Sequence, residues 1–313
     1  MSTSLVILNQ IYDRAINYHP IRASFRESTL DPATLPSPCF RSHEKMTEGF
    51  LKYVYNISPN HGRSCVSFHD GTFYTLKGTG WNLSSSSVHT SPKDPRLVFG
   101  LLGCAEAQRE YAVSLELRSI GVKHGEVVAY CLIEDRRLHG YRFKDGTRVY
   151  PSILYTKVAC PLRIKDLAWI DRSLRCDLIC SLFSANESIA LVFQQFVEQL
   201  FGSVFALHDI GGVNDSLHYD NVTVASEIVD LEWLYYPSIP LPDGSTDIIL
   251  LERQRKELLY ALEICQVLSR MIGSNSDFSS IFHMIEDQLY VGRASRLHHL
   301  QYLYDLCRGH SNE

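Results

Sequence analysis

The chain has 313 residues, of which 45% are hydrophobic and 21% charged, and its formal net charge is −5. This length fits one large two-lobed domain or two small ones, and the hydrophobic share allows a sizeable core, which excludes a disordered chain. Because there is no basic excess, we expect no nucleic-acid partner. We recognise no apolar run as long as a membrane span and no signal peptide, so no membrane partner is expected.

The predicted elements begin with a helix over residues 4–18 and a Pro- and Ser-rich extended arm over 28–42. A β-hairpin follows, because SCVSF and TFYTLKG are typical strand sequences and the intervening HDG contains the Asp-Gly pair of tight turns. Residues 78–95 are rich in Gly, Ser and Pro, which predicts a loop. A helix then runs from about 97 to 120 and ends at Gly121.

The next predicted strands are EVVAYCLIE, LHGYRF and TRVYPSILYTKVA, with KDG as the turn between the last two. From about residue 165 the pattern changes to helices, which residues 217–235 interrupt as two short strands. The main helices expected in this part are residues 186–206, 247–272, 277–289 and 293–308.

A β-rich first half with one long helix therefore precedes an α-rich second half. The order of hairpin, lysine, helix, strands and helices predicts an α+β, two-lobed protein-kinase-like fold. We expect an N-terminal helix and arm in residues 1–45, a β-rich N-lobe in 46–165, and an α-helical C-lobe in 166–313 that contains a catalytic hairpin, 217–235.

Lys77 ends an apolar strand and is followed by Gly78 and Gly80. A lysine in this place can reach phosphate oxygens as a point charge. The Gly-x-Gly sequence is compatible with a phosphate cradle but is not specific to one. The alternative is an exposed lysine at the end of a strand.

Glu110 lies in the long helix, near an apolar face that would turn toward the sheet. A carboxylate there is costly unless it is paired. Lys77 is the natural partner, as in the ion pair between a strand lysine and a helix glutamate in kinases. Glu106 and Glu116 compete for this role, and a solvated helix charge is the alternative.

The stretch LHYDNVTVASEIVDLEW, residues 217–233, contains Asp220, Asn221 and, nine residues after the asparagine, Asp230. A carboxylate at a strand end beside a turn is a common ligand of Mg²⁺, and Asn221 can supply a second oxygen. The spacing suits a β-hairpin that brings the two together, and Asp220 can then act as base or orient a nucleophile. The alternative is a surface hairpin with ordinary turn residues.

Asp215 is a second candidate for the base if the loop is irregular. A protein kinase places four residues between its catalytic Asp and its Asn, and Ser216 holds that position here. His208 and His218 flank the loop DIGGVNDS, and either can orient it through a hydrogen bond. The aromatic stretch EWLYYP, residues 232–237, either packs in the core or borders the acceptor site.

The nine cysteines include no Cys-x-x-Cys pair, and several lie in apolar patterns. We expect reduced thiols in a cytoplasmic protein rather than a disulfide framework. Cys176 and Cys180 allow a zinc site, but their helical spacing favours core packing.

Four segments resemble the selenoprotein O family of kinase-like protein adenylyltransferases. LKGTG (76–80) is similar to that family's Leu-Lys-Gly-Ala-Gly, and REYAVSLELRSIGV (109–122) to its Arg-Glu-Phe helix. TKVACPLR (156–163) is similar to its Thr-Arg-Val-Ala-Pro-Ser-x-x-Arg segment. YDNVTVASEIVD (219–230) is similar to its Thr-Asp-Asn segment, with the same step to the metal aspartate. The segments occur in the family's order.

The resemblance implies a role for each matched residue. Lys77 and Glu110 would form the ion pair at the phosphates, Asn221 and Asp230 would bind the metal, and Asp220 would be the base. Lys157 and Arg163 would hold an inverted nucleotide, so that AMP rather than phosphate is transferred.

The chain departs from the family in four respects. Lys157 replaces an arginine and loses its bidentate fork. KDPR, with Asp94 and Arg96, stands in for a Gly-Asp-Gly-Arg loop. The metal motif reads Asp-Leu-Glu rather than Asp-x-Gly, and the chain is shorter than typical members.

The sequence therefore predicts an enzyme that uses ATP and Mg²⁺ or Mn²⁺ to move AMP to a hydroxyl of an unknown protein or small-molecule acceptor. One alternative is a γ-phosphate kinase, which the Asp-Leu-Glu motif and Lys157 favour. Another is a kinase-like pseudoenzyme that serves as a binding scaffold.

Overall fold

The structure is a computed structural model. It describes residues 18–41, 64–80, 101–134, 146, 148–183, 188–239, 250–274, 276–290 and 301–305. Several predicted features lie outside these residues: the helix over 4–17, most of the loop that contains Asp94 and Arg96, and the strand LHGYRF.

The chain divides into two units, which we describe separately. The sheet unit comprises Leu8–Ala112 and Gly125–Pro161, and the helical unit comprises Met1–Ile7, Val113–His124 and Leu162–Glu313. The change from strands to helices after Pro161 lies close to the junction that the sequence predicts near residue 165. The predicted α+β class is confirmed, and the strands of the sheet precede most of the helices along the chain, as the sequence predicts.

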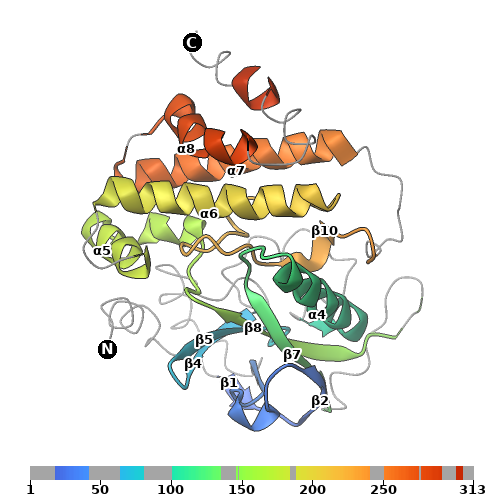
Figure 1. Ribbon diagram of the computed structural model, residues 1–313. Helices are drawn as coiled ribbons and strands as arrows, with labels where there is room; N and C mark the ends of the chain where they lie inside the picture. The colour runs from blue at the N-terminus through green and yellow to red at the C-terminus, as the bar shows by residue number, and fades with distance from the viewer. Residues whose placement is uncertain are drawn as a thin grey trace. The chain divides into compact units, whose positions relative to one another are not determined.

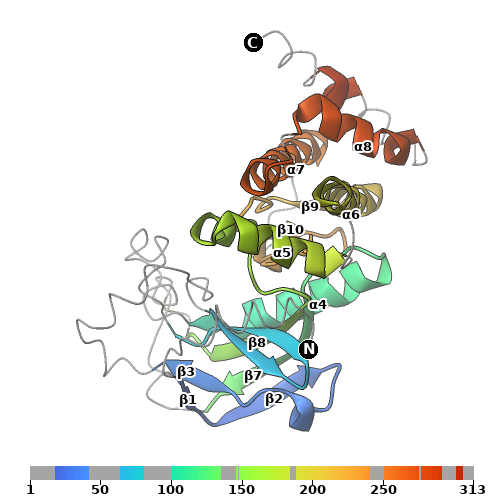
Figure 2. The ribbon, with the colours of Figure 1, turned by 90° about the vertical axis from the view of Figure 1, so that its left-hand side faces the viewer.

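The sheet unit is built on an antiparallel sheet whose main strands are adjacent in both views (Figures 1 and 2). Their order across the sheet is β2 (Ala23–Ser28), β7 (Glu126–Ile133), β8 (Pro151–Val158), β5 (Thr72–Lys77) and β4 (Ser64–His69). The short strand β6 (Leu102–Gly103) also pairs with β8. The central strand β7 is a nearly continuous apolar run, and most residues of β7 and β8 are buried.

The edge strand β2 lies just before the predicted arm of residues 28–42. It pairs with β7, and Phe25 stacks against Tyr155 of β8 with ring centroids 5.5 Å apart. The arm itself contains a 3₁₀ turn, η1 (Pro32–Thr34), and the strand β3 (Cys39–Arg41), which pairs with β1 (Tyr18–Pro20). Part of the predicted arm is therefore ordered strand.

The predicted hairpin is confirmed as β4 and β5. Its turn residues Asp70 and Gly71 have φ values of 47° and 75°, the left-handed conformation that an Asp-Gly turn adopts readily. The register pairs Cys65 with Leu76 and Ser64 with Lys77, so Lys77 is the last residue of β5.

The predicted long helix is α4 (Cys104–Ser119), which begins later than expected because Leu102 and Gly103 extend the sheet as β6. The backbone N–H of Gly103 donates to Glu106 Oε2 (2.9 Å), which satisfies a donor at the start of the helix. The helix ends as predicted before Gly121, whose φ of 76° suits a C-terminal cap.

The helical unit consists mainly of α5 (Arg172–Phe183), α6 (Ile189–Asp209), α7 (Leu250–Ile272) and α8 (Phe278–Tyr290). Helices α6 and α7 run side by side in both views (Figures 1 and 2). Ser188 caps α6 by accepting a hydrogen bond from the Leu191 N–H (3.3 Å). Within the part of the last predicted helix that is described, residues 301–305 are helical.

By length and composition alone, α6 is long and apolar enough to cross a membrane, although no such run was recognised in the sequence. Half of its most apolar window is buried inside the protein. A core helix meets the same criterion, and α6 packs against α5, α7 and α8. This packing accounts for its apolar composition.

Candidate functional site

The first group of predicted site residues lies in the sheet unit, where Lys77 and Glu110 form an ion pair. Lys77 Nζ lies 2.6 Å from Glu110 Oε1, and the two side chains are only 11% and 3% exposed. The competitors of Glu110 contact other groups: Glu106 accepts from Gly103, and Glu116 Oε2 accepts from the Tyr236 hydroxyl (3.2 Å). Burial therefore selects Glu110 as the partner of Lys77.

The chain after Lys77 turns tightly against the sheet. Gly78 has a φ of 94°, and a Cβ on it would lie 2.2 Å from the Ser152 carbonyl oxygen and 2.9 Å from Leu102 Cβ. Thr79 is fully buried and donates to the Leu76 carbonyl (3.2 Å), and Gly80 has a φ of 98°. At Gly78, close packing by itself requires a glycine.

Lys157 lies on β8, opposite Tyr74 on one neighbouring strand and Glu126 on the other, and it is exposed. It belongs to the sheet unit, whereas Arg163, which the sequence placed with it, belongs to the helical unit. Asp94 and Arg96 lie outside the described residues.

The second group lies in the hairpin of the helical unit. The Val229 N–H donates to the Asn221 carbonyl (2.9 Å), and Val222 bridges Ile228, so the chain folds back on itself. The predicted approach of Asn221 and Asp230 is therefore present in the backbone. The hairpin is anchored where the Ile228 N–H donates to the Lys123 carbonyl (3.1 Å).

The two short strands predicted within residues 217–235 form only in part. The described chain there forms isolated bridges, the 3₁₀ turn η6 (Leu231–Trp233) and the two-residue strand β10 (Leu234–Tyr235), which pairs with β9 (Val213–Asn214). The physical reason is backbone conformation, because Ser226 and Asp230 both have a φ of 62° and interrupt the extended geometry.

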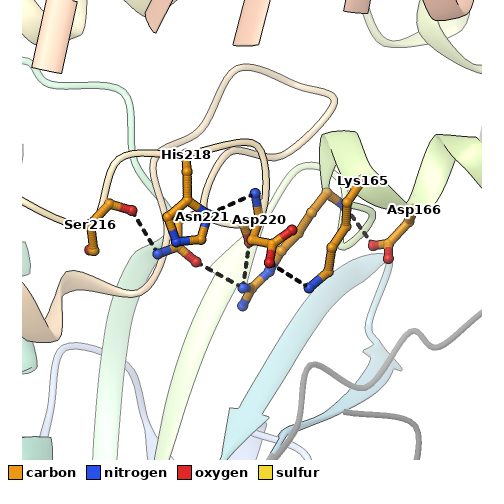
Figure 3. A network of polar contacts seen from close by, with 7 residues as sticks. Lys165, Asp166, Ser216, His218, Asp220 and Asn221 are labelled. Carbon is orange, nitrogen blue, oxygen red and sulfur yellow. Dashed lines mark hydrogen bonds and ion pairs between the residues drawn. The ribbon is translucent and has the colours of Figure 1, made fainter. Parts of the chain in front are cut away.

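Asn221 is held from both ends of its amide. Its Nδ2 donates to the Ser216 carbonyl (2.9 Å), and its Oδ1 accepts from Arg163 Nη1 (3.1 Å). The same Arg163 nitrogen donates to the Asp220 carbonyl (2.6 Å). These contacts fix a buried amide oxygen beside Asp220, in the polar network of Figure 3.

Asp220 combines an ion pair at one carboxylate oxygen with a buried second oxygen. Its Oδ2 lies 3.2 Å from Lys165 Nζ, and both side chains are about one third exposed (34% and 36%). Its Oδ1 has no hydrogen-bond partner among the described residues. Its backbone N–H donates to His218 Nδ1 (3.2 Å), so His218 orients Asp220 rather than the loop DIGGVNDS (Figure 3).

Burial lowers the pKa of His218, helped by Lys165 and Arg163 and opposed by the charges of Asp220 and Asp230. Because His218 Nδ1 accepts a hydrogen bond, the neutral ring carries its proton on Nε2.

Asp166 contacts the backbone of Arg163, and the sequence did not single it out. Its carboxylate accepts from the Arg163 N–H (2.9 Å) and closes the first turn of η5 (Ile164–Trp169). Burial raises the pKa of Asp166 to about 6, against the opposing effects of Arg163 and Lys165. The Asp three residues after Arg163 is a capping pattern that could have revealed it.

Asp230 and Asp215 differ in their surroundings. Asp230 is partly buried in the left-handed conformation, and its carbonyl accepts a long hydrogen bond from Ser216 Oγ (3.5 Å). Asp215 Oδ2 lies 2.5 Å from Arg253 Nη1 on α7. Burial raises the pKa of Asp215, with Arg253 acting in the opposite sense. Asp215 and Asp220 therefore each pair one carboxylate oxygen with a cation, and only Asp220 lies directly beside Asn221 in the chain.

The sequence also did not predict the buried pair of His208 and Glu257, which contacts Asn214 of the loop DIGGVNDS. His208 Nε2 lies 2.7 Å from Glu257 Oε2, and Glu257 Oε1 accepts from the Asn214 N–H (3.1 Å). Burial raises the pKa of Glu257 well above its usual value. Glu257 lies at helical spacing from the buried Ala261 and Cys265. An acidic residue on this apolar helix face is the sequence signal that could have predicted a buried, paired carboxylate.

Comparison with known proteins finds no matching family model and no matching curated protein. A solved structure of an Stt7 homologue from Micromonas algae, soaked with ATP, is similar over 89% of this chain and 81% of that chain, with 15% identity and a TM-score of 0.41. The Helicobacter pylori proinflammatory kinase CtkA is similar over 80% of this chain and 91% of that chain, with 12% identity and a TM-score of 0.25. At these values neither similarity assigns an activity or a site residue to this chain, and the resemblance to selenoprotein O rests on the sequence segments.

Proposed function

We propose that this protein is an ATP-dependent transferase of the kinase-like class and that it moves AMP from ATP to a hydroxyl acceptor. The observation that carries the proposal is the buried ion pair of Lys77 and Glu110 at the end of β5. Such a pair holds a lysine in the position from which it can contact nucleotide phosphates. The resemblance to selenoprotein O supplies the choice of AMP.

The donor set of the hairpin fits a divalent cation. Asn221 offers an amide oxygen and Asp230 a carboxylate, and hard oxygen ligands of this kind suit Mg²⁺ or Mn²⁺. The hydrogen bond between Val229 N–H and the Asn221 carbonyl brings the two residues to the same end of the hairpin. A bound cation would neutralise charge on the phosphates of ATP.

Asp220 is the proposed base. Lys165 holds its Oδ2, and its Oδ1 is buried without a hydrogen-bond partner among the described residues, so an acceptor hydroxyl that reached Oδ1 would supply the missing partner and could lose its proton there. Its place directly before Asn221 differs from a protein kinase, whose catalytic Asp and Asn are separated by four residues. This adjacency supports adenylyl transfer over simple protein phosphorylation.

A γ-phosphate kinase is the second candidate, and one contact favours it. Arg163 Nη1 donates to the Asp220 carbonyl and to Asn221 Oδ1, so the arginine proposed to hold an inverted nucleotide already orders the hairpin. If Arg163 has only that role, the nucleotide has no reason to bind inverted.

The deciding experiment is label transfer. The full chain is incubated with Mg²⁺ and ATP labelled on the α-phosphate or, in parallel, on the γ-phosphate, with the protein itself and a cell extract as acceptors. The proposal expects label from the α-phosphate, and label from the γ-phosphate alone would replace it with a kinase. Asp230→Ala should reduce transfer by about a hundredfold or more.

Asp177→Ala is the matched control, because Asp177 is an exposed aspartate on α5 in the same unit. Its transfer rate should equal that of the wild type. Chelation of divalent cations should stop transfer and added Mg²⁺ or Mn²⁺ should restore it. Activity that survives both chelation and Asp230→Ala contradicts the metal assignment.

A further inference from the structure

Two cysteines from distant parts of the sheet unit meet beside the hairpin that carries Lys77. Cys39 Sγ lies 3.6 Å from Cys65 Sγ, although the residues are 26 positions apart in the chain. Cys39 begins β3, whereas Cys65 lies in β4, opposite Leu76 of β5. Both are free thiols in the structure.

The two thiols differ in access. Cys65 is only 3% exposed and belongs to the core cluster, whereas Cys39 is partly exposed and packs against that cluster from outside. A small reagent in solution can therefore reach Cys39 before Cys65. The hydrogen bond from Cys65 also lowers the pKa of Cys39, while burial acts against this effect, and a thiolate is the form that attacks disulfides.

A disulfide needs a sulfur–sulfur distance of about 2.05 Å, so the two sulfur atoms must approach by only about 1.5 Å. The resulting bond would join β3 to the β4–β5 hairpin, one residue along β5 from Lys77 in the strand register.

We propose that Cys39 and Cys65 form a reversible disulfide by exchange with a low-molecular-weight disulfide such as oxidised glutathione. The Cys39 thiolate attacks one sulfur of the small disulfide, which forms a mixed disulfide and releases one small thiol. Cys65, after losing its proton, attacks Cys39 Sγ and releases the second small thiol. Two protein thiols are oxidised, one small disulfide is reduced, and the two protons pass to the released thiols.

The test begins with the wild-type full chain in buffers of defined glutathione ratio, followed by alkylation of remaining thiols and digestion with trypsin. Cleavage after Arg26, Arg41, Arg63 and Lys77 places Cys39 in the peptide 27–41 and Cys65 in the peptide 64–77, each with a single cysteine. The expected product is these two peptides joined, from a monomeric protein, with the link reversed by dithiothreitol. Two alkylated cysteines, or a link from either one to another cysteine, would overturn the proposal.

Two variants separate the roles of the thiols. Cys65→Ala should accumulate the glutathione adduct on Cys39, because the second thiol is missing, and Cys39→Ser should leave the buried Cys65 unmodified. Equal modification of Cys65 with and without Cys39 would contradict the order of attack. Cys176→Ser is the matched control, because Cys176 is a partly buried thiol on α5, and it should still form the link.

Oxidation should also raise the melting temperature of the wild type by about 5 °C, because the bond closes a long loop in the unfolded chain. Cys39→Ser should show no such rise. None of these readouts requires ATP or an acceptor, so the disulfide can fail or succeed independently of the proposed transferase activity.

Discussion

At the scale of single residues, the charge at the end of β5 is set by burial. Lys77 and Glu110 are nearly inaccessible to solvent, so each offsets part of the cost of burying the charge of the other. The sequence predicted Glu110 as the partner of Lys77, with Glu106 and Glu116 as competitors, and the ion pair confirms Glu110.

Lys77→Met should lower the free energy of unfolding by about 3 kcal/mol, because it leaves the buried Glu110 carboxylate without the charge of Lys77. The double variant Lys77→Met/Glu110→Met should recover most of that stability, since apolar residues of similar size replace the pair. Neither variant should transfer label from ATP. Urea unfolding of both variants and of Glu110→Met alone measures the coupling free energy between Lys77 and Glu110. If the losses of the two single variants simply add in the double variant, the two charges do not stabilise each other.

Asp166 should give the protein a measurable pH dependence. Burial raises its pKa from 3.8 to about 6, so the folded state binds the proton more tightly than the unfolded state. The free energy of unfolding should therefore fall as pH rises from about 4 to about 6, by at most about 3 kcal/mol. Asp166→Asn keeps an oxygen for the Arg163 N–H and should remove this fall.

Urea unfolding at pH values from 4 to 7 tests the prediction. Relative to the wild type, Asp166→Asn should gain stability as pH rises. Asp177→Asn, at an exposed position, should follow the wild-type curve. If the curves of Asp166→Asn and wild type run parallel, the buried carboxylate does not titrate in this range.

At the scale of elements, turns decide where the candidate residues lie. The β4–β5 turn and the bend after Lys77 both use glycines with positive φ, but their surroundings differ. Nothing lies within 4 Å of a Cβ built on Gly71, whereas a Cβ on Gly78 would overlap the Ser152 carbonyl.

Gly71→Ala should cost about 1 kcal/mol of stability, because only the backbone conformation is strained. Gly78→Ala should cost about 3 kcal/mol or more, because the chain must also move away from Ser152 and Leu102. Urea unfolding of the two variants checks the difference. Equal losses would show that the bend after Lys77 can shift without cost.

The hairpin of residues 217–235 shows the limit of reading strands from sequence. Its apolar residues predicted two strands, and they are buried, but positive φ values at Ser226 and Asp230 break the extended conformation. The β4–β5 hairpin was predictable because its Asp-Gly turn is a local signal. The positive φ at Ser226 and Asp230 has no such local signal, because neither residue is followed by a glycine, and an isolated Asp, although enriched in that region, adopts it only in a minority of cases.

At the scale of the whole molecule, binding of nucleotide should be visible as stability. A ligand that binds only the folded protein at 100 times its dissociation constant adds about 2.7 kcal/mol. Mg²⁺ and ATP together should therefore raise the melting temperature by about 5 °C. ATP with a chelator, or Mg²⁺ and ATP with Asp230→Ala, should give a smaller rise, and no rise for the wild type would favour the pseudoenzyme.

The sequence by itself determined the α+β class, the β4–β5 hairpin, the central strands β7 and β8, the end of α4, and the main helices of the second half. These depend on periodicity, composition and turn residues, which act over short distances along the chain. It also marked Lys77, Asn221 and Asp230 as candidates from residue type and spacing.

Only the tertiary structure decided which groups contact one another. Arg163 holds Asp220 and Asn221, and the thiols of Cys39 and Cys65 come together. Such contacts join positions far apart in the chain, and the burial that surrounds them exists only after folding. The ion pair of Lys77 and Glu110 was predictable because a charge at a strand end and a charge near an apolar helix face need each other, whereas the local sequence carries no record of the other contacts.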